Sequence, residues 1–314
     1  MKILKIITNS FYSIILPFKI YFESDFKPKL LASIFIFLFL FSIFEYIFNL
    51  NKDFGTLGVI SIFLIPFFVT VCLIAKHKKN YEFVQSKFFW ILSFLILLIL
   101  IANDEMKISI WIARSFIPEG YRFIGYKILK QFEILIFYLI PFLLWNPLKR
   151  LQEPSRNKES MSRLEVPLSS YLFFFIPMIF VTILISFHHD FRLYYPIVPL
   201  DKPEIGYVAT LQWIIAFEIF YILAFIATEW FFRGFIIREF ETFLGKESIL
   251  LMLPLYVSIH FGKPFLETIS SMFGGFVLGI LSYYTGNIRG GVLLHIGIAM
   301  IMELMGFYWI RNLR

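Results

Sequence analysis

Long apolar segments separated by short charged loops dominate this sequence and restrict what it can fold into. Nine such segments lie at about 30–48, 57–75, 88–102, 131–145, 169–187, 207–228, 248–261, 267–285 and 291–310. A helix needs roughly 17–25 residues to cross a bilayer, so three of them, 88–102, 131–145 and 248–261, are short. The sequence therefore predicts an all-α fold, a polytopic transmembrane helical bundle of about 8–9 spans.

The composition and charge also fit a membrane protein. Hydrophobic residues make up 59% of the 314 residues, and no polar stretch is long enough for a separate soluble domain. A net charge of +7 would suggest nucleic acid in a soluble protein, but here Lys and Arg flank apolar segments. That pattern indicates membrane lipid as a partner, and we expect no nucleic acid. The single cysteine, Cys72, excludes an intramolecular disulfide and a cysteine-based metal site.

The distribution of Lys and Arg predicts the topology. They concentrate at the N-terminus, in the loop 76–87 and in the polar stretch 146–168, and the positive-inside rule places all three in the cytoplasm. The stretch 146–168 is the predicted cytoplasmic linker between an N-terminal membrane half, 1–145, with about four spans, and a C-terminal membrane core, 169–314. The basic region 103–130 is the exception, since it lies outside by this count. It is interpreted as an interfacial helix or a further span.

Charged residues at membrane depth indicate the functional part of the chain. Glu229 and Arg233 end a long apolar run one helical turn apart, in the order that favours an ion pair. His260 ends another apolar segment, and His295 lies inside the last one. A single buried His or Glu is more often a structural contact than a catalyst. Three such residues within four neighbouring helices favour a common site, where they are expected to converge.

A further acid leaves a different function open. Glu218 precedes Glu229 by eleven residues, which puts both on nearly the same face of one helix. Together with the two histidines they could relay protons, so a proton-coupled membrane transporter is an alternative. The sequence shows no internal repeat, which counts against this alternative.

The order of these motifs resembles one known family. A Glu-x-x-x-Arg-Gly at a helix end, an aromatic-x-x-x-His, a glycine-rich span and a last His-bearing helix are similar to the CAAX protease and bacteriocin-processing (CPBP, or Abi) family of intramembrane endopeptidases. The resemblance covers about residues 207–304. It implies a protease-like C-terminal core that cleaves a peptide or protein substrate near the membrane surface. It also implies a multi-pass protein of a bacterial plasma membrane.

The resemblance implies roles for four residues. Glu229 and Arg233 match the second Glu and the Arg of the family's first motif, and His260 and His295 match the histidines of the next two. Glu229 would then activate water, and the histidines would stabilise the oxyanion of the intermediate. Alternatively, Glu229, His260 and His295 hold a divalent metal such as zinc, with water as fourth ligand, which would make a metalloprotease.

Three positions depart from the family pattern. Thr228 stands where the family has its first Glu, Tyr256 where it has Phe, and Ala299 where it has Asn or Asp. Because that first Glu usually activates the water, a degenerate, catalytically inactive member is an alternative. Glu267 and Glu303 are interpreted as structural acids or as substitutes for the missing one.

Overall fold

The computed structural model describes residues 2–24, 26–78, 81–149, 163–197 and 210–312. Within these ranges the chain is helical, without a β-strand, and eight stretches are long and apolar enough to cross a membrane. They are Pro28–Phe48, Gly55–Lys78, Lys87–Phe116, Glu119–Leu148, Leu168–Ser186, Leu211–Ser258, Phe265–Thr285 and Arg289–Asn312. The predicted all-α polytopic bundle of an integral membrane protein is confirmed.

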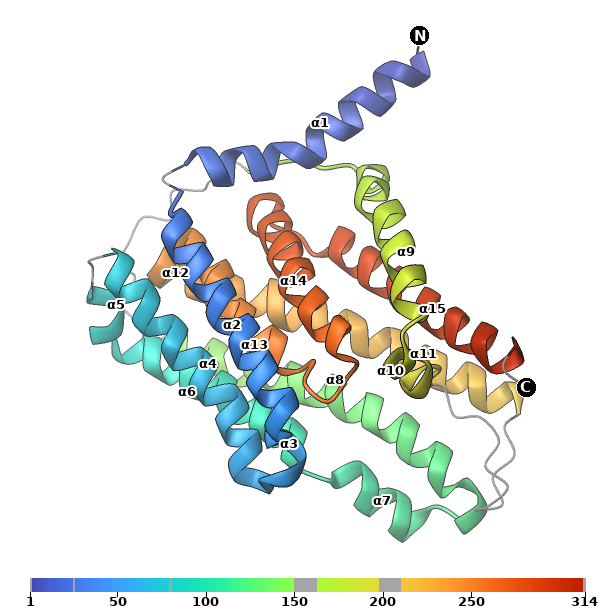
Figure 1. The fold of residues 1–314 in the computed structure, drawn as a ribbon. Coiled ribbons are helices and arrows are strands. Elements are labelled where there is room, and N and C mark those ends of the chain that lie inside the picture. The colour runs from blue at the N-terminus through green and yellow to red at the C-terminus, as the bar shows by residue number, and fades with distance from the viewer. Residues whose placement is uncertain (1, 25, 79–80, 150–162, 198–209, 313–314) are drawn as a thin grey trace.

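The helices pack around one another and α1 lies across one end of the bundle (Figure 1). The first part of the chain forms α1 (Lys2–Glu23), α2 (Pro28–Phe48), α3 (Leu50–Asp53), α4 (Gly55–Lys78), α5 (Glu82–Gln85), α6 (Lys87–Glu105), α7 (Ile108–Phe116) and α8 (Arg122–Lys149). The second part forms α9 (Leu172–Ser186), α10 (His189–Tyr194), α11 (Leu211–Glu229), α12 (Ile237–Leu244), α13 (Ser248–Ser258), α14 (Phe265–Thr285) and α15 (Arg289–Asn312). A π-helical segment, η4 (Trp230–Ile236), joins α11 to α12.

Local sequence signals explain where several helices begin and end. Helix α2 starts at Pro28, which lacks the backbone N–H that a first helical residue would leave unpaired. Ser86 caps α6 by accepting a hydrogen bond from the Phe89 amide. Helix α14 ends before Gly286, whose φ of 67° is the left-handed conformation that glycine adopts most easily. These signals set where α2 and α6 begin and where α14 ends.

The two ends of the bundle differ: one has a cluster of ion pairs and the other has a cavity. At one end, called the α1 end, Lys27 and Lys78 both bind Glu247. At the opposite end, called the α10 end, α3 and α10 line a common cavity with the turn between α13 and α14. The predicted topology would place the α1 end in the cytoplasm.

Helix α13 lies inside the bundle. All of its eleven residues are buried, and it packs between α4 and α14. At about 1.5 Å per residue it is too short to cross a bilayer alone. The two predicted spans 207–228 and 248–261 belong to the single stretch Leu211–Ser258, in which α11 continues through η4 and α12 before the chain turns into α13. This is why eight stretches are found and not nine.

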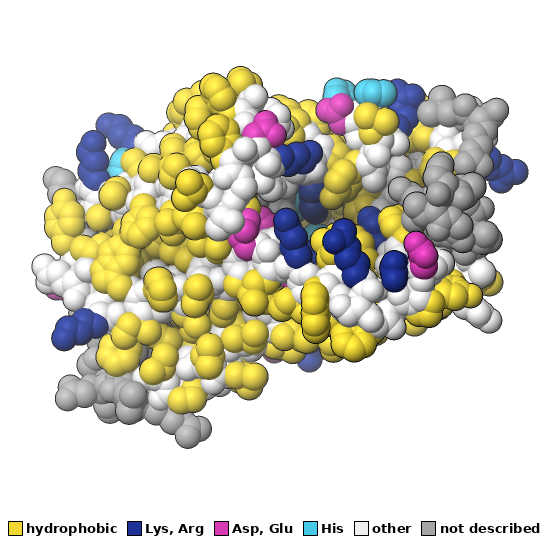
Figure 2. All heavy atoms as spheres, turned by 90° about the horizontal axis from the view of Figure 1, so that it is seen from below, with side chains coloured by type: hydrophobic (Ala, Val, Ile, Leu, Met, Phe, Trp, Pro, Cys, Tyr) yellow, Lys and Arg dark blue, Asp and Glu magenta, His cyan; other side chains and the backbone are white. Residues whose placement is uncertain are grey.

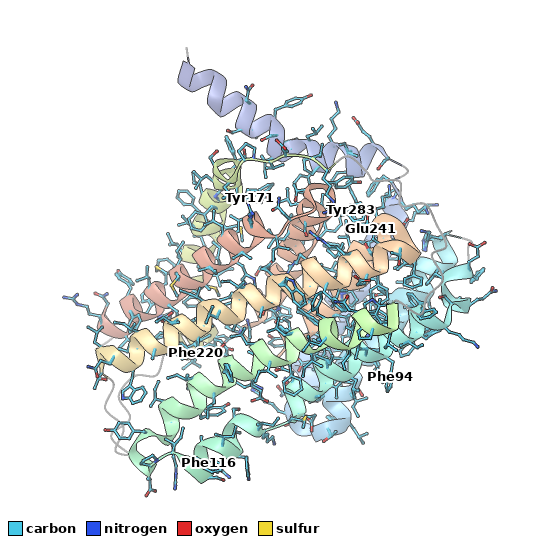
Figure 3. The ribbon with its side chains drawn as sticks, turned by 180° about the vertical axis from the view of Figure 1, so that it is seen from behind. Phe94, Phe116, Tyr171, Phe220, Glu241 and Tyr283 are labelled. Atoms are coloured by element: carbon cyan, nitrogen blue, oxygen red, sulfur yellow. The ribbon has the colours of Figure 1, made fainter. Side chains whose placement is uncertain are left out.

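The predicted interfacial helix corresponds to α7. Its Trp111 and Phe116 side chains are 62% and 71% exposed, and Figure 3 shows Phe116 at the edge of the bundle, as it does Phe94 of α6. One hydrophobic core joins α2, α4, α6 and α8 to α13 and α14, so the two predicted halves share their interior. Most of the predicted linker, 150–162, lies outside the described residues.

Candidate active site

Glu229 and Arg233 form the predicted ion pair where α11 meets η4. Nη1 of Arg233 donates a hydrogen bond of 2.9 Å to Oε1 of Glu229, and both side chains are 0% exposed. Arg233 lies within the π-helical segment, a rare conformation that is frequent at functional sites. Each buried ion needs a counter-charge, because an unpaired charge in a protein interior is strongly unfavourable. Here Glu229 and Arg233 are the counter-charges of each other, within one continuous helical stretch.

His295 of α15 contacts the same carboxylate oxygen. Its Nδ1 lies 2.8 Å from Oε1 of Glu229, and its side chain is 14% exposed. Since a carboxylate only accepts, Nδ1 donates, and Nε2 of the neutral ring is then an acceptor. Gly291, one turn earlier, allows this approach, because a Cβ there would lie 2.8 Å from Oε2 of Glu229. Helix α15 thus contacts one carboxylate oxygen through His295 and leaves room for the other at Gly291.

His260 reaches this group through Tyr256 of α13. Nδ1 of His260 lies 2.8 Å from the Tyr256 carbonyl oxygen, and the two ring centroids are 4.7 Å apart. The Arg233 guanidinium lies 3.8 Å from the centroid of the Tyr256 ring, and the His295 ring lies 6.3 Å from it. Tyr256 is therefore the residue that connects the four predicted ones. The sequence marked it only as a departure from Phe, although an aromatic ring one turn before a histidine is a usable signal.

One histidine of the site is neutral, and several buried polar atoms lack hydrogen-bond partners. Burial, followed by the charge of Lys263, lowers the pKa of His260 well below its usual range, so the ring is neutral near pH 7. Within the described part of the chain, Nε and Nη2 of Arg233 and Oε2 of Glu229 are buried without a hydrogen-bond partner. Unsatisfied buried groups are uncommon in proteins and require an explanation. The Nε and Nη2 atoms of Arg233 are therefore unused hydrogen-bond donors inside the site.

Two of the three departures from the family pattern, Thr228 and Ala299, place no acid or amide in the site. The Thr228 hydroxyl donates to the Ala224 carbonyl oxygen over 2.8 Å, one turn back along its own helix. Ala299 is 4% exposed and packs in an apolar cluster with Phe217 and Tyr221. Neither position supplies an acid or an amide to the site.

The other acids form a separate cluster toward the α10 end. Glu267 accepts from Lys263 over 2.9 Å and from the Tyr195 hydroxyl over 2.8 Å. Glu303 accepts from the Ile197 amide over 2.8 Å. These contacts attach the chain after α10 to α14 and α15. They support the interpretation of Glu267 and Glu303 as structural acids.

A metal held by Glu229, His260 and His295 does not fit this arrangement. Among the described residues, no group of three or more His, Cys, Asp or Glu side chains lies close enough to hold a metal ion. The Arg233 guanidinium also occupies the carboxylate oxygen that His295 shares, and a second cation there would be repelled. The predicted metal set stays a prediction, which metal analysis of the protein tests.

A cavity of about 260 Å³ lies beside the site at the α10 end. Its lining includes Glu45 and Lys52 near α3, Asp190 of α10, and Lys263, three residues after His260. The face seen from below is hollowed near its centre, where Lys and Arg side chains gather (Figure 2). Gly262 and Lys263, in the turn after His260, are therefore reachable from this end of the bundle.

The comparisons with known proteins match the part of the chain that holds the site. Residues 210–301 match a family described as type II CAAX prenyl endopeptidase Rce1-like. No curated protein and no solved structure matches the chain. The matched residues run from the start of α11 into α15 and include Glu229, Arg233, His260 and His295. Over this region the resemblance to the CAAX protease family of membrane endopeptidases is confirmed.

Proposed function

We propose that the protein is an intramembrane endopeptidase of the CAAX-protease type that hydrolyses a peptide or protein substrate near the membrane surface. The observation that carries the proposal is the shared carboxylate oxygen of Glu229, which Arg233 and His295 both contact. Glu229 fixes the imidazole, as the acid of a catalytic triad does. The bacterial plasma membrane is proposed as its location.

The contacts favour His295 as the group that removes a proton from water. Its Nδ1 is held by Glu229, so the Nε2 lone pair is available and the 14% exposed ring can be reached. The positive charge that forms on the ring is stabilised by the neighbouring carboxylate. Glu229 itself is less suited as the base, because Arg233 and His295 engage one oxygen and burial excludes water from the other.

Arg233 and His260 would act in the steps of hydrolysis that follow the activation of water. Hydroxide attacks the scissile carbonyl, and the negative charge on its oxygen requires donors aimed at that position. Nε and Nη2 of Arg233, which are without a hydrogen-bond partner in the described structure, would supply such donors. The proton on His295 then passes to the leaving amine. His260, neutral and with Nε2 unprotonated, accepts a hydrogen bond from the attacking water.

A second candidate is an inactive member that binds peptide without cleaving it. The observation that favours it is the loss of polar groups at Thr228 and Ala299, whose positions are filled by a back-bonded hydroxyl and a buried methyl group. Peptide binding would be retained in this case, and hydrolysis lost.

Cleavage and metal content measured on the same detergent-purified protein test the proposal. We expect wild type to cleave a membrane peptide, with or without a prenylated cysteine, and His295→Gln to lower kcat by about 10²–10⁴-fold. Glu267→Gln is the matched control, since Glu267 contacts Lys263 and Tyr195 but no site residue among its hydrogen bonds.

Each outcome distinguishes the candidates. Equal cleavage by wild type and His295→Gln would contradict the proposed base. Peptide binding without cleavage in wild type would favour the inactive member. Stoichiometric zinc that is lost with activity in His260→Ala would favour the metal alternative, and proton uptake into liposomes without cleavage would favour the transporter.

A further inference from the structure

The turn between α14 and α15, at the α1 end, brings together two arginines that are distant in sequence. Nη1 of Arg163 donates to the Gly286 carbonyl oxygen over 3.3 Å, and Nη2 of Arg238 donates to the same oxygen. The Arg163 side chain also lies against Gly286, where any Cβ would collide with it. Two guanidinium groups therefore converge on one neutral acceptor.

The two arginines carry like charges and repel each other where they share the Gly286 carbonyl oxygen. Two acids, Glu239 and Glu241, lie near Arg238 as well. Glu239 also accepts a hydrogen bond from the Trp145 indole over 2.9 Å. One arginine would be sufficient to cap the end of α14, whose last carbonyl groups carry a partial negative charge. An anion bound between the two guanidinium groups would relieve their repulsion.

A cavity lies at the same place. It has a volume of about 540 Å³, and Arg163, Glu165, Thr285 and Asn287 are among its lining residues. The segment that begins at Arg163 is held beside the turn by a hydrogen bond from the Leu164 amide to the Tyr284 carbonyl oxygen, 3.0 Å long. Figure 3 shows Tyr283 and Glu241 side by side at the α1 end, which locates α12 and α14 next to this turn.

Further donors lie beside the converging arginines. Helix α15, with 24 residues, begins at Arg289 just after the turn, and the N-terminus of a helix attracts anions. Within the described residues, Nε of Arg238 is buried without a hydrogen-bond partner. We propose that Arg163 and Arg238 form a binding site for a phosphate group at the α1 end of the bundle. The predicted position of this end at the cytoplasmic surface favours the headgroup of an anionic phospholipid as the source of that phosphate.

Thermal unfolding of the full-length protein in neutral detergent tests this site. The probes are phosphatidylglycerol, phosphatidylcholine and inorganic phosphate, each at matched ionic strength. We expect phosphatidylglycerol to raise the midpoint temperature of wild type by about 3 °C over phosphatidylcholine. Arg163→Gln/Arg238→Gln should lose most of that shift. Arg114→Gln/Arg311→Gln, which removes two exposed arginines at the α10 end, should keep it.

The possible outcomes distinguish a lipid headgroup from free phosphate as the ligand, and some of them would contradict the site. A shift with inorganic phosphate as large as that with phosphatidylglycerol would keep the site and assign it to free phosphate. No shift with either probe in wild type, or an equal shift in both double variants, would overturn the proposal. If the double variant does not fold, Arg163→Gln alone is compared with Arg311→Gln by the same criteria, since both side chains are exposed.

Discussion

Two ion pairs with the same spacing in sequence lie near His260 and differ in their surroundings. Glu229 and Arg233 are 2.9 Å apart and 0% exposed, whereas Lys263 and Glu267 are also 2.9 Å apart but 24% and 10% exposed. Their N–O distances alone would suggest that the two ion pairs are equally strong. Burial separates them, because water screens the outer pair and cannot reach the inner one.

The partners of the two pairs differ as well. The inner carboxylate also holds a histidine, whereas the outer one holds the hydroxyl of Tyr195 after α10. The inner pair thus orients a side chain that can exchange protons, and the outer pair attaches one segment of the chain to α14. The comparison teaches that i, i+4 spacing alone does not distinguish a candidate site from a structural ion pair. Burial does, because two buried opposite charges each need the other as a counter-charge.

The strongest way to sharpen this comparison is to remove the inner cation. Arg233→Met leaves the Glu229 carboxylate buried without its counter-charge, which should lower the free energy of unfolding by about 3–5 kcal/mol. Unfolding in mixed micelles of mild detergent and dodecyl sulfate measures this. Adding Glu229→Gln should recover part of the loss. An Arg233→Met protein as stable as wild type would show that the pair is not energetically coupled.

The second largest effect on stability is expected where α15 closely approaches the Glu229 carboxylate. Gly291→Ala places a Cβ 2.8 Å from Oε2 of Glu229, so the carboxylate or the helix must shift. We expect a loss of stability of up to about 3 kcal/mol and lower cleavage, because His295 moves with α15. Gly274→Ala in α14 is the control, since its Cβ would meet nothing within 4 Å. Equal effects of the two substitutions would contradict the tight contact.

The Tyr256 ring connects the Glu229–Arg233 pair to His260, and its replacement is expected to change stability less than the two substitutions above. Tyr256→Leu removes the aromatic face 3.8 Å from the Arg233 guanidinium, which should cost about 2 kcal/mol in stability. Tyr256→Phe keeps that face and should remain close to wild type in unfolding. If Leu and Phe variants unfold alike, the ring does not stabilise Arg233.

Much of the fold and part of the site were predictable because they depend on local sequence. The lengths of the apolar segments predicted the spans, and the Glu229–Arg233 spacing predicted their pairing. The burial of α13 was not predictable, since apolar residues suit both lipid and protein interior. Leu253 of α13 is 0% exposed, whereas Leu184 of α9 is 71% exposed. The role of Tyr256 also depends on contacts between residues far apart in sequence.

The smallest effect is expected at the outer pair, where it sharpens the comparison most directly. Lys263→Met should change the free energy of unfolding by only about 0–1 kcal/mol at pH 7, because the pair is partly exposed. Burial lowers the pKa of Lys263, but the charge and hydrogen bond of Glu267, together with contributions from neighbouring tyrosines, outweigh burial and raise that pKa above 10.5. A group whose pKa is raised by folding stabilises the protein below its unfolded pKa, and this contribution is lost as pH rises through the folded value. The difference between wild type and Lys263→Met should therefore stay constant from about pH 6 to pH 9 and shrink above about pH 10.5. A loss at pH 7 as large as that of Arg233→Met would mean that exposure does not separate the two pairs.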